Sequence, residues 1–348
     1  MKTSIIGGGG LVGSMAAYAL QCGGVISSIC IIDANKDLGQ GVATDLLHGA
    51  SLAADQRISA GDMSEISSSD IVVITAGLRR KPEESRLDLI NRNVDLFLNL
   101  LDQIKSAGLK KSAYLVIVSN PVDVLTYLAV ERSGLPWQRV IGLGTQLDTA
   151  RFRSYLAQRL KVPPTQVQAM ILGEHGDSMV PIWSSATVAG LPLEQWPGFN
   201  EQVRREVFEQ TKTAGARLIK LKGGSGFGVG LSIREVVHAL ATDSRRLLPV
   251  STMQQGLFGL RDVCLSVPTV VGCGGARQQI ELPLTAKERL GLQNSAKVLR
   301  EIKDRVEARV GAVNGPDRLV PTNHAATTAG ARPIPRSAWL AGSRAGGK

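Results

Sequence analysis

The apolar positions in the first part of the chain form short β-branched runs, and segments with helical periodicity separate them. We predict strands from these runs at residues 5–7, 29–33, 71–76, 114–119 and 140–143. Strands that alternate with helices are typical of a parallel, doubly wound sheet. The pattern therefore predicts an α/β domain over residues 1–146.

The pattern changes after residue 147 to longer amphipathic segments. We predict helices around residues 148–160, 200–221 and 285–310, and strands near 167–172 and 263–282. Residues 147–310 are therefore expected to form a second, α+β domain. From residue 311 to 348, Gly, Ala, Pro, Ser and Thr dominate without periodicity, which predicts a disordered tail.

Composition changes this picture little. An apolar content of 43% over 348 residues is enough for extended cores. The chain lacks a basic and apolar leader and any apolar stretch of membrane-spanning length, so we expect neither export nor membrane insertion. The four cysteines show neither metal-ligand spacing nor the density of a disulfide framework. We therefore expect a cytoplasmic protein without a metal site.

The formal net charge of +10 raises the question of nucleic-acid binding. About +4 of this charge lies in the predicted tail, residues 311–348. The remainder is spread along the chain without a basic cluster interleaved with aromatic residues. We therefore expect a small anionic substrate rather than a nucleic acid.

Residues 3–13 read TSIIGGGGLVG and place Gly8, Gly10 and Gly13 between a predicted strand and a predicted helix. This is the dinucleotide fingerprint in the context that it requires, and it makes the first domain one of Rossmann type. Asp33 follows the second predicted strand, where an acceptor for the ribose hydroxyls belongs. Because a carboxylate there repels a 2′-phosphate, we predict NAD rather than NADP as the cofactor.

Two further motifs carry candidate chemistry. Residues 172–181, LGEHGDSMVP, place His175 in a glycine-flanked turn, and residues 142–153, GLGTQLDTARFR, place Asp148 and Arg151 on one face of a helix start. Taken singly, each has a simpler explanation, since a lone histidine is usually structural and a helix often begins with an acidic residue.

Together, these motifs resemble the lactate/malate dehydrogenase family. The likeness runs from about Lys2 to Val310 and includes VSNPVD at 118–123, LPVSTMQQGLFG at 248–259 and LSVPTVVG at 265–272. The resemblance implies a Rossmann-type sheet, a C-terminal α+β substrate domain, and hydride transfer between NAD and a 2-hydroxy acid.

The resemblance assigns three catalytic roles. His175 matches the histidine that exchanges a proton with the substrate, Asp148 the carboxylate that orients it, and Arg151 the arginine that binds the substrate's C1 carboxylate. An imidazole that titrates near neutrality suits proton exchange, an aspartate on its other nitrogen fixes the tautomer, and a guanidinium matches a carboxylate bidentately.

The resemblance also extends to residues around the substrate and the cofactor. Residues 77–89, GLRRKPEESRLDL, resemble a mobile loop in which Arg86 polarises the C2 oxygen of the substrate. Asn120 matches a residue that hydrogen-bonds the substrate, and Ser225 a hydroxyl beside the substrate's side chain. The implied cofactor contacts are Gly8, Gly10, Leu11, Val12, Gly13, Asp33, Thr75, Ala76, Gly77, Asn93, Val118 and Asn120.

Arg80 decides the predicted substrate. Malate enzymes of the family carry arginine at this position and lactate enzymes glutamine, and an arginine buried unpaired beside pyruvate would cost about 3 to 5 kcal/mol. Thr145 and residues 173–191, in contrast, are more similar to lactate dehydrogenases. We weight Arg80 above this framework and predict an NAD-dependent malate dehydrogenase. L-lactate dehydrogenase, a dehydrogenase of another 2-oxo acid, and a binding protein without turnover remain the alternatives.

The resemblance further implies an oligomer. Subunits of the family pair through the helix that corresponds to residues 40–54, and two such dimers often associate. We expect a homotetramer, with a dimer as the alternative.

Overall fold

The computed structural model describes residues 1–78 and 83–311. Arg80 and residues 312–348, where we predicted a disordered tail, lie outside the described residues. The elements of the first half are β1 (Lys2–Ile6), α1 (Leu11–Gly23), β2 (Ser28–Ile32), α2 (Lys36–Gly49), β3 (Arg57–Gly61), β4 (Ile71–Ile74), α3 (Arg86–Ser106), β5 (Tyr114–Ile117), α4 (Val122–Arg132) and β6 (Val140–Gly142).

The second half continues with both helices and strands. Its elements are α5 (Gln146–Leu160), β7 (Val167–Leu172), β8 (Val180–Val188), β9 (Leu191–Pro192), α6 (Glu201–Lys222), α7 (Phe227–Thr242), β10 (Arg246–Gln255), β11 (Arg261–Gly272), β12 (Gly275–Gln279) and α8 (Ala286–Val310).

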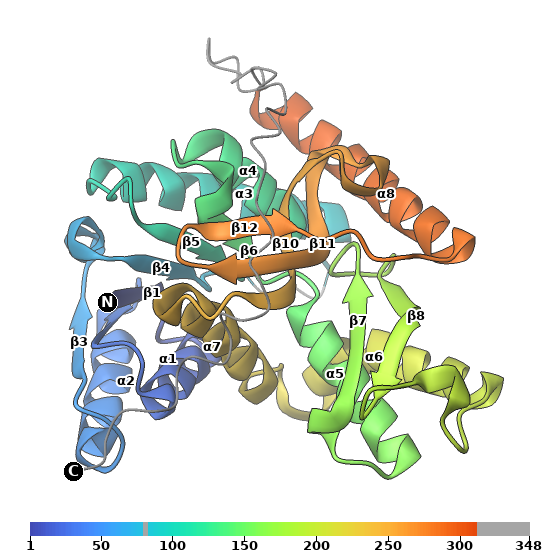
Figure 1. The fold of residues 1–348 in the computed structure, drawn as a ribbon. Helices are drawn as coiled ribbons and strands as arrows, with labels where there is room; N and C mark the ends of the chain where they lie inside the picture. The colour runs from blue at the N-terminus through green and yellow to red at the C-terminus, as the bar shows by residue number, and fades with distance from the viewer. Residues whose placement is uncertain (79–82, 312–348) are drawn as a thin grey trace, which may run out of the picture. The chain divides into compact units, whose positions relative to one another are not determined.

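The central sheet has nine strands in the order β12-β11-β10-β6-β5-β4-β1-β2-β3. The six strands of the first half are parallel to their neighbours and follow the order of a dinucleotide-binding sheet. The predicted doubly wound parallel sheet is therefore confirmed. β10 pairs antiparallel with β6, and β11 and β12 continue the sheet beyond it (Figure 1). The strands from residue 246 onward thus extend the first domain's sheet, which the sequence did not indicate.

Successive side chains of the parallel strands point to opposite faces of the sheet, so the apolar side chains are divided between two cores. Ile6, Val72 and Ile74 enter one core, and Ile5 and Val73 enter the other. Helices α3, α4 and α8 cover the first core, whereas α1, α2 and α7 cover the second (Figure 1). Burial on both faces explains why these strands read as continuous apolar runs.

A third core lies in the second half, between the antiparallel sheet β7-β8-β9 and helices α5 and α6. Phe152 and Leu156 from α5 pack there with Val203 and Val207 from α6. This layer is joined to the central sheet by paired hydrogen bonds between Gly173, at the end of β7, and Ser266 of β11. The junction brings the residues after β7 next to the carboxyl ends of the parallel strands.

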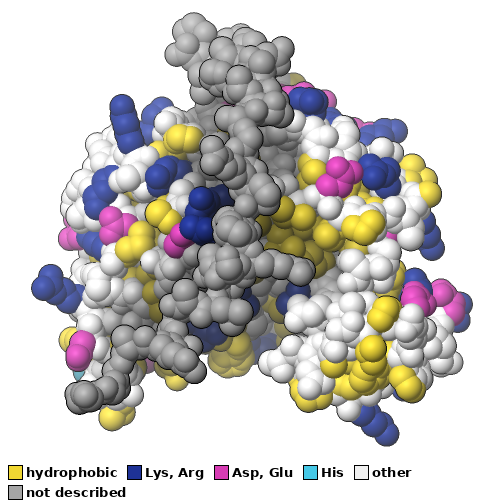
Figure 2. Space-filling model, viewed as in Figure 1, with side chains coloured by type: hydrophobic (Ala, Val, Ile, Leu, Met, Phe, Trp, Pro, Cys, Tyr) yellow, Lys and Arg dark blue, Asp and Glu magenta, His cyan; other side chains and the backbone are white. Residues whose placement is uncertain are grey.

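On the face in Figure 2, basic and acidic side chains are interspersed outside the grey atoms. Within residues 1–78 and 83–311, no helix is both long and apolar enough to cross a membrane.

Candidate active site

A cavity of about 660 Å³ lies at the carboxyl ends of β1, β4, β5 and β6 and extends to the turn after β7. Ligands of doubly wound sheets bind at this edge. Most of the predicted site residues line it: Gly10, Leu11, Val12, Gly13, Thr75, Gly77, Asn93, Val118, Asn120, Asp148, Arg151, His175 and Ser225. Gly8, Asp33 and Ala76 are not among the lining residues. Arg86 is the first residue of α3, and Arg80 lies outside the described residues.

The glycine-rich turn joins β1 to α1 with very little space between the two elements. A Cβ atom on Gly13 would lie 2.3 Å from the carbonyl oxygen of Gly7, and one on Gly8 would lie 2.9 Å from that of Ile5. Gly7, which we had not singled out, is the residue of the turn with a positive φ, 81°. The glycines are therefore required by packing and by backbone conformation.

The N-terminus of α1 opens onto the cavity. Gly10 is its cap residue, no side chain caps the helix, and its first turn contains no acidic residue. The first N–H groups of a helix lack intrahelical partners and carry partial positive charge. Because Gly10, Leu11 and Val12 line the cavity at this point, the terminus fits a dinucleotide's diphosphate.

Asp33 is held beside the same turn. Its Oδ2 accepts a hydrogen bond from the Gly9 N–H at 2.9 Å, and its Oδ1 accepts one from the Asn35 N–H at 3.0 Å. These two bonds fix the carboxylate at the end of β2, which is where a ribose acceptor is required. The turn and Asp33 together fit an adenine dinucleotide.

His175 and Asp148 form the centre of the chemical part of the cavity. Asp148, in the first turn of α5, is almost fully buried, and its Oδ2 lies 2.5 Å from Nδ1 of His175. Arg151, one turn further along α5, donates from Nη1 to Oδ1 of Asp148 at 3.1 Å. The imidazole is 23% exposed, so its free edge can reach a ligand in the cavity.

The charges of this pair stabilise one another. Burial alone would lower the pKa of His175, but the charge of Asp148 and the hydrogen bond to it outweigh burial and raise that pKa above its usual value. Burial likewise would raise the pKa of Asp148, but His175 and then Arg151 hold it below its usual value. The site thus favours an imidazolium next to a carboxylate, as proton transfer to and from a substrate oxygen requires.

The backbone before His175 is anchored at successive residues. Gly173 exchanges two hydrogen bonds with Ser266, and the Glu174 N–H donates to Oγ of Ser295 at 2.7 Å. The His175 N–H donates to Oδ2 of Asp123 at 2.8 Å. β11, α8 and α4 therefore all hold the turn that carries the histidine.

The two predicted asparagines lie in the cavity wall. Oδ1 of Asn93 accepts from the Leu78 N–H at 2.7 Å and so joins α3 to the segment after β4. Asn120 follows β5, and its Oδ1 accepts from the Val122 N–H at 3.3 Å. Each side chain thus accepts a backbone hydrogen bond that fixes its orientation.

Sequence reasoning missed several residues that line the cavity. Asp123 belongs to the VSNPVD motif, and Glu174 and Asp177 flank His175, so their motifs were the available signal. Lys212, Gly215 and Ile219 recur at helical spacing on one face of α6. Only the structure shows that this face borders the site.

A dinucleotide-binding sheet whose cavity also contains a histidine paired with a buried aspartate is typical of an NAD-binding oxidoreductase. The profile of the lactate/malate dehydrogenase NAD-binding domain matches residues 1–142, and that of the family's alpha/beta C-terminal domain matches residues 145–310. The chain belongs to the lactate/malate dehydrogenase family.

The curated relatives and the solved structure to which this chain is similar are L-lactate dehydrogenases. An L-lactate dehydrogenase of Synechococcus sp. is 42% identical over 88% of this chain and 99% of the relative, and one of Acetivibrio thermocellus is 40% identical over 87% and 96%. The crystal structure of a minor L-lactate dehydrogenase from Enterococcus mundtii is 35% identical, covers 88% of this chain and 98% of its own, and has a TM-score of 0.84.

The prediction of a malate dehydrogenase is therefore wrong, because these relatives are L-lactate dehydrogenases. It depended on Arg80 alone and assumed that this guanidinium is enclosed with the substrate. Arg80 is one of three consecutive basic residues, 79–81, so its identity does not establish which of them would meet a ligand. The lactate-like framework around Thr145 and residues 173–191 was the better guide.

Proposed function

We propose that this protein is an NAD-dependent L-lactate dehydrogenase that interconverts L-lactate and pyruvate. The observation that carries the proposal is the contact between His175 and Asp148, with Arg151 beside it, in a chain whose relatives are L-lactate dehydrogenases at 38–42% identity.

The cofactor would be held at the β1 end of the cavity. The N–H groups at the start of α1 would bind its diphosphate, and Asp33 would accept hydrogen bonds from its ribose hydroxyls. NAD, when bound, supplies the acceptor or donor of the hydride at C2 of the substrate.

The protein's own residues orient the substrate and move the proton. Arg151 binds the C1 carboxylate, and since a guanidinium has five N–H donors, its bond to Asp148 leaves donors for this ligand. In lactate oxidation, Nε2 of His175 accepts the proton of the C2 hydroxyl, and in pyruvate reduction it returns the proton. Asp148 fixes the Nδ1–H tautomer and stabilises the imidazolium. Asn120, Ser225 and Arg86, the first residue of α3, complete the proposed substrate contacts.

Steady-state oxidation of NADH with pyruvate and with oxaloacetate, assayed in parallel, tests the proposal. We expect kcat/KM for pyruvate to exceed that for oxaloacetate by at least roughly 10²-fold, because a site built for a methyl group disfavours a second carboxylate. The His175→Asn protein, purified in the same way, measures contaminating activity. Equal efficiencies or a preference for oxaloacetate would refute the lactate assignment.

We also propose that the protein is a homotetramer, or a dimer, that pairs through α2 and the residues that follow it. Leu38, Leu47 and Leu52 are 47%, 53% and 90% exposed, which is unusual for leucines so close in sequence. Analytical ultracentrifugation of the parent and of Leu47→Lys measures the mass directly. A parent that sediments as a monomer would contradict this proposal.

A further inference from the structure

Asp123 is a buried carboxylate in contact with the catalytic turn. It lies in the first turn of α4, the residue is 2% exposed, and its Oδ2 accepts the His175 N–H at 2.8 Å. Oδ1, in contrast, has no hydrogen-bond partner within the described part of the chain, although it is fully buried. A buried carboxylate is costly and therefore calls for an explanation.

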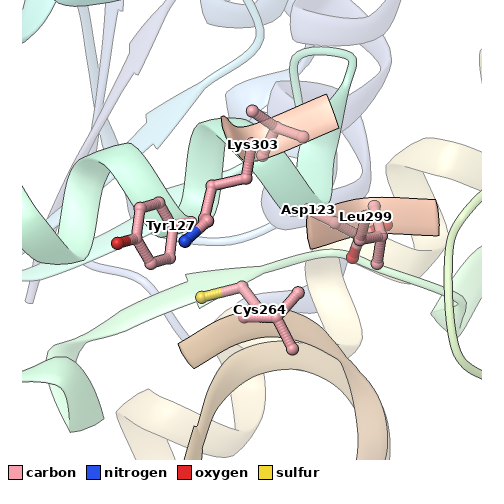
Figure 3. Close-up of a pocket in the computed structure, with 7 residues that line it drawn as sticks. Asp123, Tyr127, Cys264, Leu299 and Lys303 are labelled. Carbon is pink, nitrogen blue, oxygen red and sulfur yellow. The ribbon is translucent and has the colours of Figure 1, made fainter. Parts of the chain in front are cut away.

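Within residues 1–78 and 83–311, no basic side chain lies at hydrogen-bonding distance from this carboxylate. Asp123 lines both the active-site cavity and a smaller one between α4, β11 and α8, which is too small to hold a water molecule (Figure 3). Lys303 lines the smaller cavity, but its amine lies over the ring of Tyr127, 5.1 Å from the centroid, and 3.1 Å from Asp304. Burial thus raises the pKa of Asp123 to about 7, although Ser251 and His175 act against it.

The titratable and charged groups that face Asp123 come from all the elements around it. They are His175 and Glu174 after β7, Cys264 on β11, Lys303 on α8 and Tyr127 on α4 itself. Burial keeps the pKa of Cys264 well above its usual value and also raises that of Tyr127, so both stay neutral around pH 7. The negative charge of Asp123 favours the protonated form of His175, whereas Glu174 disfavours ionisation of Asp123.

We propose that Asp123 is a second positioning residue for His175, which fixes the histidine's backbone while Asp148 fixes its ring, and whose charge favours the imidazolium. This inference rests on the proposed function, because it assigns His175 the transfer of the substrate's proton. Two carboxylates, those of Asp123 and Asp148, then act on one histidine. Asp148 stays ionised through the neutral range, and Asp123 gains or loses its proton within it.

Two substitutions separate the backbone bond from the charge. Asp123→Asn keeps an oxygen that can accept the His175 N–H and removes the charge, whereas Asp123→Ala removes both. We expect Asp123→Ala to lower kcat for pyruvate on the order of 10²-fold with little change in KM, and Asp123→Asn to recover most of that loss. Thr126→Val is the matched control, since Thr126 is a buried residue on α4 whose hydroxyl, among the described residues, bonds to the Val122 carbonyl of its own helix.

The imidazole pKa of His175, followed by NMR, reports on the charge without any substrate. The His175→Asn spectrum assigns the resonance among the four histidines. We expect the pKa to fall by roughly half a unit or more in Asp123→Asn and to stay at the parent value in Thr126→Val. In pyruvate reduction, which requires the imidazolium, the alkaline limb of the pH profile should move to lower pH by the same amount.

Several outcomes would overturn the inference. An unchanged His175 pKa in Asp123→Asn refutes the role of the charge, and parent-like kcat in Asp123→Ala refutes the role of the bond. Equal losses of kcat in both variants, with lowered Tm and an unmoved pH profile, would show that Asp123 only stabilises the fold. A parent that does not reduce pyruvate would refute the proposed function instead, and the NMR titration would still decide whether Asp123 acts on His175.

Discussion

Two helices begin at the same cavity but differ in what their first turns contain. The first turn of α1 has neither a capping side chain nor an acidic residue, so its N–H groups are available to a ligand. The first turn of α5 contains the almost fully buried carboxylate of Asp148, which pairs with His175 and Arg151. The positive end of α1 is therefore free for an external anion, whereas that of α5 stabilises an anion of the protein itself.

This difference separates binding from chemistry. In the proposed function, the α1 region holds the cofactor through backbone groups, and it needs glycines because a Cβ on Gly8 or Gly13 would lie too close to a backbone carbonyl oxygen. The α5 region changes the proton affinity of one imidazole and needs charged side chains in fixed positions. Substitutions in the two regions should therefore have different kinetic signatures.

The largest expected effect is that of His175→Asn. It removes the proton donor and acceptor but no group near the start of α1, so turnover of pyruvate should fall by about 10³-fold or more. NADH binding, measured by fluorescence titration, should stay within about two-fold of the parent. A comparable loss of NADH affinity would show that the two regions are not separable.

Asp148→Asn should produce the next largest effect. Because the charge of Asp148 and its hydrogen bond raise the pKa of His175, the substitution should lower that pKa. We expect a loss of kcat in pyruvate reduction on the order of 10²-fold near pH 7, which shrinks as the pH falls and the imidazole becomes protonated. A loss that is the same at pH 5.5 and pH 8 would exclude this electrostatic role.

Gly13→Ala should affect binding and stability rather than chemistry. Its Cβ would lie 2.3 Å from the Gly7 carbonyl oxygen, so α1 must move away from the turn. We expect weaker NADH binding and a loss of stability of about 1 to 3 kcal/mol in urea unfolding. Gly23→Ala, at the other end of α1, is the control, because a Cβ there meets only the flexible side chain of Arg234, at 3.2 Å, and it should be nearly neutral. Similar results for the two variants would mean that the turn tolerates a side chain.

Asp33→Ser should give the smallest change in rate and the clearest change in selectivity. The substitution removes the ribose acceptor together with the charge that repels a 2′-phosphate. The KM for NADH should rise and the ratio of kcat/KM for NADH over NADPH should fall, with kcat near the parent value. An unaltered cofactor preference would exclude Asp33 from the site.

The fold was predictable where apolar periodicity is strong. The runs that became β1, β2, β4, β5 and β6 are buried on both faces, which leaves a continuous apolar signal. β3, with the sequence RISAG, lies at an edge and is only partly buried. β10 is mostly buried, but its sequence contains polar residues and Pro249, so its pattern does not indicate a strand. Its pairing with β6 joins residues that are far apart in the sequence, which periodicity cannot predict.

The site residues could be predicted only where they belong to a recognisable sequence motif. Nothing in the spacing of Asp148 and His175, 27 residues apart, indicates the 2.5 Å contact between them, which was expected from the family resemblance alone. Asp123 shows the limit of motif reading. It follows a cis Asn120–Pro121 bond in a motif that was expected to supply only substrate and cofactor contacts, and its contact with His175 spans 52 residues.

The anchored turn around His175 also bears on how such an enzyme can change its specificity. Successive backbone groups of Gly173, Glu174 and His175 are bonded to β11, α8 and α4, so the proposed proton-transfer group is held by the framework of the fold. Lys212, Gly215 and Ile219 line the same cavity from a single face of α6, which takes no part in these bonds. We therefore expect substitutions on this face of α6 to change which acid is accepted before they change the proton transfer proposed for His175.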